Sequence, residues 1–227
     1  MQAVVITGIT RGVGYALARR FAGSYAIVGC GRNPEHLQKV RSAHPDWDVQ
    51  QADLADPAQA EAFAAYVRQK YPHIALLVNN AGAFREGSLL TEPPQLYEEM
   101  LRTNLHSAYH VTRGLLPVFL AQKKGLIVLV SSIAAFLPYP RGASYAVAKA
   151  GLRALGRNLR YTLKDHGVAV TTLLLGATYT DSWAGTEHPP ERFIPPEAVA
   201  DLVWAIAHLP PSAVVEELVL RPLLGDL

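Results

Sequence analysis

The chain has 227 residues, of which 50% are hydrophobic and 18% are charged, so it can bury a sizeable core and is too apolar for a disordered protein. Its formal net charge of +2 excludes strong attraction to phosphate backbones, and we expect no nucleic-acid partner. A single cysteine, Cys30, excludes a disulfide framework and a thiolate-rich zinc site. The longest apolar stretch, residues 126–137, is too short to cross a membrane. We expect a cytoplasmic globular protein without a metal site or a membrane partner.

Short apolar runs alternate along the chain with segments of helical length. The runs are typical of strands buried on both faces, and they lie at residues 3–7, 25–30, 48–52, 74–79, 125–131, 168–175 and 214–220. The expected helices cover residues 13–22, 57–69, 95–122, 143–166 and 196–208. This alternation predicts a doubly wound α/β fold of the Rossmann type, with a mostly parallel sheet of about seven strands and helices on both faces. We expect residues 1–227 to form one domain, with a substrate loop near residues 179–195.

The first expected strand runs directly into a glycine-rich segment, Thr7-Gly8-Ile9-Thr10-Arg11-Gly12-Val13-Gly14, and a helical pattern follows at once. Glycines let the backbone turn tightly beside a pyrophosphate, whose charge is stabilised by a helix N-terminus. A plain glycine turn is the alternative. The residues expected to bind a dinucleotide here are Gly8, Thr10, Arg11, Gly12, Val13 and Gly14.

The end of the second strand indicates which dinucleotide is bound. Enzymes that use NAD place an acidic residue there to bind the ribose 2′-hydroxyl. This chain has Gly31 at that point, followed by Arg32, and Arg11 supplies a second cation from the glycine loop. Guanidinium groups offer fork-shaped donors to a 2′-phosphate, so we predict NADP(H) rather than NAD(H). An ordinary solvated arginine is the alternative for Arg32.

The third and fourth strands end in further candidate contacts. Asp53 is placed either to accept a hydrogen bond from the adenine amino group or to cap the following helix. The small and amide residues after the fourth strand either pass close to the adenosine ribose or simply form a turn. The expected cofactor contacts in these two segments are Asp53, Leu54, Asn80, Ala81 and Gly82.

Candidate catalytic residues follow in the second half of the chain. Tyr145 and Lys149 are one turn apart on an expected helix, so the phenol and the ammonium group share one face. A cation within about 4–6 Å lowers the pKa of a tyrosine, which makes it a better proton donor at neutral pH. Ser132 closes the fifth strand at the sheet edge where a ligand is expected. Asn104 can add a polar group from a third element.

In these motifs, and in their order and spacing, nearly the whole chain resembles the short-chain dehydrogenase/reductase family. The resemblance implies a catalytic tetrad of Asn104, Ser132, Tyr145 and Lys149. Tyr145 would exchange a proton with the substrate oxygen, and Ser132 would donate a hydrogen bond to that oxygen. Lys149 would also bind the nicotinamide ribose, and Asn104 would position a water beside it. The implied activity is NADP(H)-dependent interconversion of a carbonyl and a primary or secondary alcohol by a homodimer or homotetramer.

The chain departs from the family pattern after the sixth strand. The family usually has Pro-Gly there, and this chain has Leu175 before Gly176. Loss of the fixed φ of proline adds backbone freedom, so the expected contacts of Gly176, Thr178 and Thr180 with the nicotinamide are less constrained.

The substrate is less well indicated than the cofactor. Aromatic residues near the expected pocket favour a mostly apolar substrate, namely Phe84, Phe136, Tyr139 and Trp183. Arg141 is either an anchor for a substrate carboxylate or, more simply, a surface arginine. Residues 195–222 resemble family members that act on 3-hydroxy acids and related small alcohols. The alternative function is that of a dinucleotide-binding sensor or scaffold without turnover.

Overall fold

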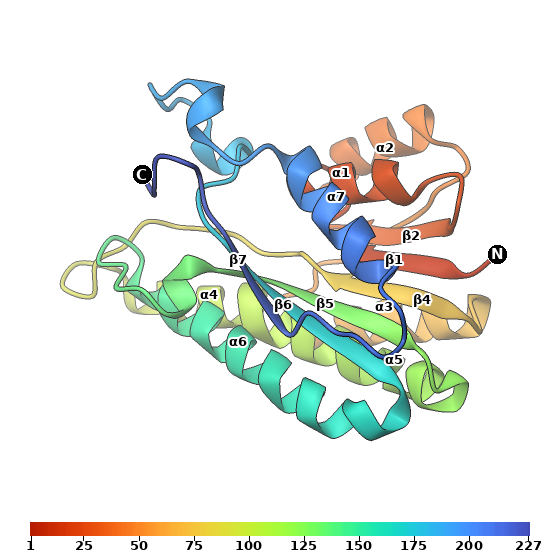
Figure 1. The fold of residues 1–227 in the computed structure, drawn as a ribbon. Coiled ribbons are helices and arrows are strands. Elements are labelled where there is room, and N and C mark those ends of the chain that lie inside the picture. The colour runs from red at the N-terminus through yellow and green to blue at the C-terminus, as the bar shows by residue number, and fades with distance from the viewer.

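The structure is a computed structural model that describes residues 1–227, and only the backbone of Ser182. Seven parallel strands form one sheet among these residues, in the order β3-β2-β1-β4-β5-β6-β7 (Figure 1). The strands are β1 (Ala3–Thr7), β2 (Ala26–Gly31), β3 (Asp48–Gln51), β4 (Ile74–Asn79), β5 (Gly125–Ser132), β6 (Val168–Leu175) and β7 (Glu217–Leu220). The predicted doubly wound fold is confirmed.

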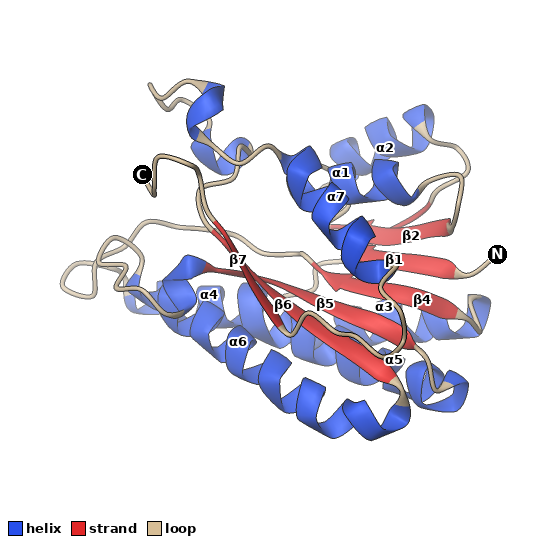
Figure 2. Ribbon diagram, viewed as in Figure 1, coloured by secondary structure: helices blue, strands red, loops and turns tan.

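Helices cover both faces of the sheet (Figure 2). They are α1 (Gly12–Phe21), α2 (Pro34–Ala43), α3 (Pro57–Lys70), α4 (Pro94–Leu101), α5 (Ser107–Gln122), α6 (Ala143–Leu163) and α7 (Pro196–Ala207). Helices α1, α2 and α7 lie on one face, and α3, α5 and α6 lie on the other. Asn33 caps α2 by accepting a hydrogen bond from the amide of His36, and Pro34 occupies the first turn.

The core consists of one apolar layer on each side of the sheet. All five residues of β1 are buried. Successive side chains of a strand point to opposite faces, so Val4 and Ile6 pack in one layer and Ala3 and Val5 in the other. Each fully buried Val or Ile contributes about 1.5–3 kcal/mol through removal from water. This two-sided burial explains why the strands have nearly continuous apolar sequences rather than alternating ones.

The long helix predicted for residues 95–122 is interrupted in its hydrogen-bonding pattern. A π-helical segment, Arg102–His106, joins α4 directly to α5, so residues 94–122 remain one continuous helical segment. The predicted helix 143–166 ends at Leu163 and continues only as a 3-10 turn, Lys164–His166. The last strand is shorter than predicted, at Glu217–Leu220. In the described part of the chain, no helix combines the length and apolarity needed to cross a membrane.

Strand β1 marks the point where the strand order reverses direction. It pairs with β2 on one side and β4 on the other. In open α/β sheets, the crevice at the carboxyl ends of the strands at such a point is where ligands bind. Residues 177–195 form a loop at this edge, closed at its base by hydrogen bonds of 2.9 Å between Tyr179 N and Ile194 O and between Ile194 N and Ala177 O.

Candidate active site

A groove of about 660 Å³ runs along the carboxyl ends of β1, β2 and β4. Twelve of the residues predicted to bind a dinucleotide line it, namely Gly8, Thr10, Arg11, Gly12, Val13, Arg32, Asp53, Leu54, Asn80, Ala81, Gly82 and Thr180. The structure therefore brings together segments that follow five different strands, namely β1, β2, β3, β4 and β6, as expected from the sequence.

The glycine loop at the start of α1 has a backbone that only glycine adopts readily. Gly8 and Gly12 have φ values of 69° and 54°, in the left-handed region. A side chain at Gly14 would overlap the carbonyl oxygen of Gly8. The Asn80 amide also holds this loop, because its Nδ2 donates to the carbonyl oxygens of Thr7 (2.9 Å) and Gly8 (3.2 Å). Asn80 thus supports the turn as well as lining the groove.

Thr7 is a supporting residue that the sequence analysis did not single out. Its buried Oγ1 accepts hydrogen bonds from the amides of Asn80 (3.0 Å) and Ala81 (2.9 Å). These bonds fix the end of β1 to the loop after β4. A hydroxyl at the end of an otherwise apolar buried strand was the available signal, since a buried polar group needs partners.

The two arginines predicted to bind a 2′-phosphate have different surroundings. Arg32 is exposed beside the end of β2 and forms no ion pair with the described side chains. Arg11 Nη1 instead lies 2.5 Å from Asp181 Oδ2, in a pair whose side chains are both 58% exposed. The prediction treated Arg11 as an available second cation, whereas the structure pairs it with the loop after β6. A surface pair of this kind contributes at most about 1 kcal/mol, so a phosphate can compete for it.

The position where NAD enzymes carry an acid is sterically restricted. A Cβ atom on Gly31 would lie 2.8 Å from Thr10 Cγ2 and 3.5 Å from Leu37 Cδ2. An aspartate at this position would therefore need Thr10 to move. The packing of Thr10 in the glycine loop therefore disfavours an acidic side chain at position 31.

Asp53 lines the groove and does not cap the next helix. Its Oδ1 accepts a hydrogen bond of 3.1 Å from the amide of Ala55. The N-cap of α3 is Asp56, whose side chain accepts a 2.9 Å hydrogen bond from the amide of Ala58. The capping alternative for Asp53 is therefore wrong.

A second cavity, of about 230 Å³, adjoins the groove and shares Val13, Phe84 and Thr180 with it. It contains three of the four predicted catalytic residues together with the predicted residues after β6. The predicted residues that line it are Val13, Ser132, Tyr145, Lys149, Gly176, Thr178 and Thr180. A cavity of this size next to the groove accommodates a small molecule.

Tyr145 lines this second cavity, which we call the catalytic cavity. Burial raises the pKa of its phenol to about 12, opposed by a hydrogen bond with Ser132 and reinforced by the nearby Tyr139. The lowered pKa expected from the sequence is thus absent in this structure. The Lys149 ammonium group lies 5.5 Å from the centre of the Tyr145 ring, and its Nζ donates to the carbonyl oxygen of Val130 at 2.9 Å. Desolvation of the phenol is thus the main cause of its raised pKa.

Lys149 is buried beneath the tyrosine. Its side chain enters from α6, and the Ser131 hydroxyl donates a 3.0 Å hydrogen bond to its backbone carbonyl. Burial lowers the pKa of the Lys149 ammonium group to about 8, because the charged form is poorly solvated. Most of the lysine is still protonated at neutral pH, so it presents a positive charge below the phenol.

Asn104 lies in the π-helical segment and faces the same region from a third element. Its Nδ2 donates to the carbonyl oxygens of Ala83 (2.9 Å) and Met100 (3.1 Å), and its Oδ1 accepts from the amide of Ala83 (3.2 Å). A Cβ atom on Gly82 would approach both Asn104 Oδ1 (2.7 Å) and Lys149 Nζ (3.4 Å). Asn104 and Lys149 thus flank Gly82. Single π turns inside helices occur often at functional sites.

Ser132 ends β5 beside the tyrosine. Its Oγ accepts a 3.2 Å hydrogen bond from the amide of Ala134 and so caps the short 3-10 turn at Ile133–Ala135.

Strand pairing fixes the segment after β6. Leu175 pairs with Leu220, and Gly176 N donates to Leu220 O at 2.8 Å. Pairing with β7 therefore supplies rigidity that the missing proline would have given.

Aromatic side chains form part of the catalytic cavity. Phe84 and Tyr139 have ring centres 5.3 and 6.3 Å from that of Tyr145, and Trp183 lines the cavity from the loop at residues 177–195. Phe136 does not line it and instead lies 5.3 Å beneath the guanidinium carbon of Arg153. Arg141, considered as a carboxylate anchor, forms an exposed ion pair of 2.7 Å with Glu86.

Two of the cavity residues that were not predicted from the sequence come from the far end of the chain. Asp226 and Leu227 line the catalytic cavity, although they lie about eighty residues beyond Tyr145 in the chain. No motif marks them, because their position depends on the path of the chain after β7.

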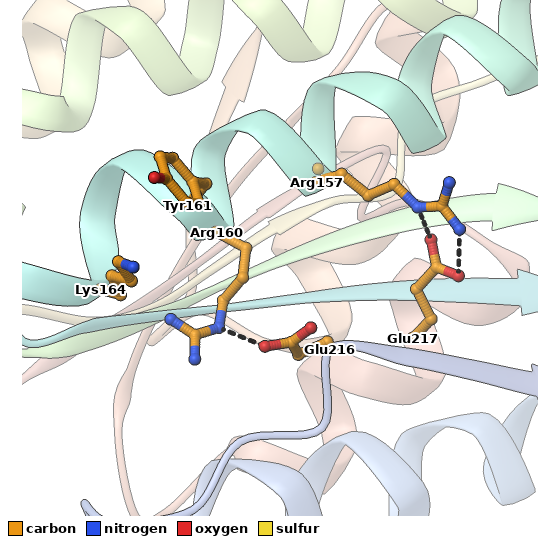
Figure 3. A pocket seen from close by; sticks show the side chains of 7 residues that line it. Arg157, Arg160, Tyr161, Lys164, Glu216 and Glu217 are labelled. Carbon is orange, nitrogen blue, oxygen red and sulfur yellow. Dashed lines mark hydrogen bonds and ion pairs between the residues drawn. The ribbon is translucent and has the colours of Figure 1, made fainter.

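A third hollow lies between α6 and β7 (Figure 3). It is lined by Gly156, Arg157, Arg160, Tyr161, Lys164, Glu216 and Glu217. Arg157 pairs with Glu217 at 2.8 Å and Arg160 with Glu216 at 3.0 Å. Hydrogen bonds from Arg153 and Arg157 lower the pKa of Glu217 to about 2, with burial opposing them. These ion pairs hold β7 against α6, and Lys164 lies with its Nζ 4.4 Å from the centre of the Tyr161 ring.

Comparison with known proteins agrees with this geometry. The family model for short chain dehydrogenases matches residues 2–190. The chain is 30% identical to a sepiapterin reductase of Chlorobaculum tepidum over 239 aligned positions, covering 99% of this chain and 97% of the relative. It is also 30% identical to an NADP-dependent 3-hydroxy acid dehydrogenase of Salmonella typhi, covering 96% and 94% of the two chains.

Solved structures show the same similarity. An alcohol dehydrogenase from Thermococcus sibiricus, complexed with 5-hydroxy-NADP, superposes with a TM-score of 0.89 at 27% identity and covers 98% of this chain and 97% of its own. The matched sequence model, the whole-chain relatives and the seven-stranded parallel sheet agree. This chain belongs to the short-chain dehydrogenase/reductase family.

Proposed function

We propose that the protein is an NADP(H)-dependent oxidoreductase that interconverts a small carbonyl compound and its primary or secondary alcohol. The observation that carries the proposal is the position of Ser132, Tyr145 and Lys149. All three line a cavity that opens beside the groove of the glycine loop. A proton donor next to a dinucleotide groove is the arrangement that hydride transfer to a carbonyl requires.

The groove fits a dinucleotide phosphate. The left-handed Gly8 and Gly12 shape the turn before α1, and the missing side chain of Gly14 lets the helix start directly against the Gly8 carbonyl. A pyrophosphate in the groove would lie at this helix N-terminus. Arg32, without an acid beside it, is suited to a 2′-phosphate, and the relatives named above include proteins described with NADP. When bound, the nicotinamide ring supplies or accepts the hydride. Tyr145 and Lys149 would hold its ribose, and Gly176, Thr178 and Thr180 would face the ring.

The proton is transferred by the protein's own side chains. With a pKa raised to about 12, the Tyr145 phenol is fully protonated at neutral pH and can give its proton to the substrate oxygen as negative charge develops there. Ser132 donates a hydrogen bond to the same oxygen. The tyrosinate left behind is stabilised by the Lys149 ammonium group beneath it. Asn104 keeps the loop at Gly82 in place beside the lysine. In the oxidation direction the tyrosinate acts as the base.

Two further features belong to the proposal. Residues 1–227 act as one domain, because the catalytic cavity combines residues from near both ends of the chain, and residues 179–195 act as the substrate loop. The protein works in the cytoplasm as a homodimer or homotetramer. Exposed apolar side chains on α5 and α6, Tyr109 and Val147 among them, support such an assembly.

The test is oxidation of NADPH across aldehydes, ketones and 3-oxo esters by the wild type and by Tyr145→Phe. Loss of a positioned proton donor should lower kcat by about 10²–10⁴-fold, while NADPH still binds through the groove and Lys149 with a much smaller loss of affinity. Tyr161→Phe, which removes the hydroxyl of an exposed tyrosine on the same helix, is the matched control. A wild type that binds NADPH but reduces none of these compounds would support the sensor or scaffold alternative.

A further inference from the structure

The segment from Arg221 to Leu227 closes one side of the catalytic cavity. After β7 the chain turns back through a hydrogen bond of 2.9 Å from Gly225 N to Pro222 O, with Gly225 at a φ of 82°. Arg192, from the loop after β6, donates to the carbonyl oxygens of Gly225 (3.2 Å) and Asp226 (3.3 Å). The segment is thus attached to that loop, at the edge of the sheet where both lie (Figure 1).

The Asp226 carboxylate has a fixed position within this segment. Arg221 binds it with two hydrogen bonds, Nε to Oδ1 at 3.2 Å and Nη2 to Oδ2 at 2.5 Å. On the other side, Asp226 Oδ1 lies only 3.0 Å from where a Cβ atom on Gly176 would stand. Asp226 lines the catalytic cavity whereas Arg221 and Arg192 do not. Arg221 therefore binds the carboxylate from outside the cavity, and Arg192 fixes the backbone of the same residue. A carboxylate accepts more than two hydrogen bonds, so Asp226 can still accept one from a substrate.

At that end the cavity is lined by the acidic member of the Arg221–Asp226 ion pair and not by the basic one. Among the described residues lining it, Lys149 is the basic one and Asp226 the acidic one. Lys149 is 5% exposed and directed at a backbone carbonyl below the reaction centre. The nearby exposed arginines are also engaged, Arg11 by Asp181 and Arg141 by Glu86. A substrate carboxylate in the cavity would therefore lie nearer to Asp226 than to Arg221, because only Asp226 of this pair lines the cavity.

We propose that Asp226 is a specificity-determining residue. It selects carbonyl substrates that carry a hydroxyl or amino group near the carbonyl and excludes those that carry a carboxylate. The inference rests on the proposed carbonyl reductase function. A carboxylate accepts hydrogen bonds from such donors, whereas a second carboxylate in the same partly desolvated space is repelled. The feature thus argues against 3-oxo acids as substrates, in spite of the resemblance of residues 195–222 to acid-reducing relatives.

The test compares three methyl ketones of four carbons that differ only at the far end: a carboxylate (acetoacetate), a hydroxyl (hydroxybutanone) and an ammonium group (aminobutanone). Unsubstituted butanone is the reference. We expect the wild type to favour the ammonium and hydroxyl compounds over acetoacetate in kcat/KM. In Asp226→Asn the ratio of the ammonium compound to acetoacetate should fall by about tenfold or more, mainly through KM. Butanone should change little.

Two further variants separate selectivity from folding. Asp226→Glu keeps the charge and should keep the discrimination against acetoacetate, even if the packing of the segment changes. Asp165→Asn makes the same charge change at an exposed position on the 3-10 turn after α6 and should leave all ratios unchanged. If Asp226→Asn lowers kcat/KM for all four substrates in parallel and keeps their ranking, the inference is overturned and the reductase function remains intact. Failure of the wild type to oxidise NADPH with any carbonyl compound overturns both.

Discussion

The preference for NADP(H) should depend mainly on Arg32. A hydrogen bond between a charged guanidinium and a phosphate contributes about 1.5–3 kcal/mol, and the exposure of Arg32 favours the lower half of that range. At about 1.4 kcal/mol for each factor of ten, Arg32→Ala should raise the KM for NADPH by about 10–40-fold and leave the KM for NADH nearly unchanged. Arg11→Ala should have a smaller effect, because Arg11 must first give up its pair with Asp181.

A change of cofactor preference from NADPH to NADH should require two substitutions. In Gly31→Asp the new Cβ would lie 2.8 Å from Thr10 Cγ2, and a threonine cannot easily rotate its methyl away. The single variant should therefore lose activity with both cofactors. Adding Thr10→Ser removes that methyl group and keeps the hydroxyl, so the double variant should recover activity with NADH but not with NADPH.

The assay is the ratio of kcat/KM for NADPH to kcat/KM for NADH at a saturating carbonyl substrate. A low-salt and a high-salt series add a check, because a phosphate–arginine contact weakens as salt screens it. If Arg32→Ala weakened both cofactors equally, the arginine would have no role specific to the 2′-phosphate. A single Gly31→Asp variant that used NADH as well as the double variant would refute the steric argument.

Three further results are expected. Asp181→Asn should lower the KM for NADPH by a few-fold at most, since it releases Arg11 from a surface pair of about 1 kcal/mol or less, and initial rates measure this. The kcat/KM for carbonyl reduction should fall as the pH rises through about 8, where Lys149 loses its charge, and a pH–rate profile that stays flat to pH 10 would contradict this. Glu217→Gln should destabilise the fold by about 1–2 kcal/mol at pH 7 in urea unfolding, a value discounted for partial exposure of its pair with Arg153. The pKa of Glu217 is depressed to about 2, so its contribution is complete above pH 4.5, and the difference from the wild type should narrow as the pH falls toward 2.

Local patterns predicted those parts of the site that depend on neighbours in sequence. The glycine loop could be recognised because Gly8, Gly12 and Gly14 follow a buried strand directly, and Tyr145 and Lys149 because helical spacing puts them on one face. Likewise, continuous runs of Val, Ile and Leu are enough to predict a parallel sheet that is covered on both faces.

Features that depend on distant segments were not predictable. The pair of Arg11 with Asp181 joins residues 170 positions apart, and the Asp226 carboxylate reaches Gly176 only because β7 pairs with β6. The raised pKa of Tyr145 reflects burial, which its spacing from Lys149 does not reveal. The π-helical turn at Asn104 shifts backbone hydrogen bonds by one residue without any change of composition.

The two hollows of the site draw on different parts of the chain. Apart from Thr180 and Asp181, the groove uses residues between Gly8 and Thr103, whereas the catalytic cavity beyond Val13 and Phe84 uses residues from Val130 onward. The residues that line the coenzyme groove therefore lie mostly in the N-terminal half of the chain, and those that line the catalytic cavity lie mostly in the C-terminal half. Chimaeras that exchange one half with a relative could alter either property while the other is retained, provided that the few shared positions match.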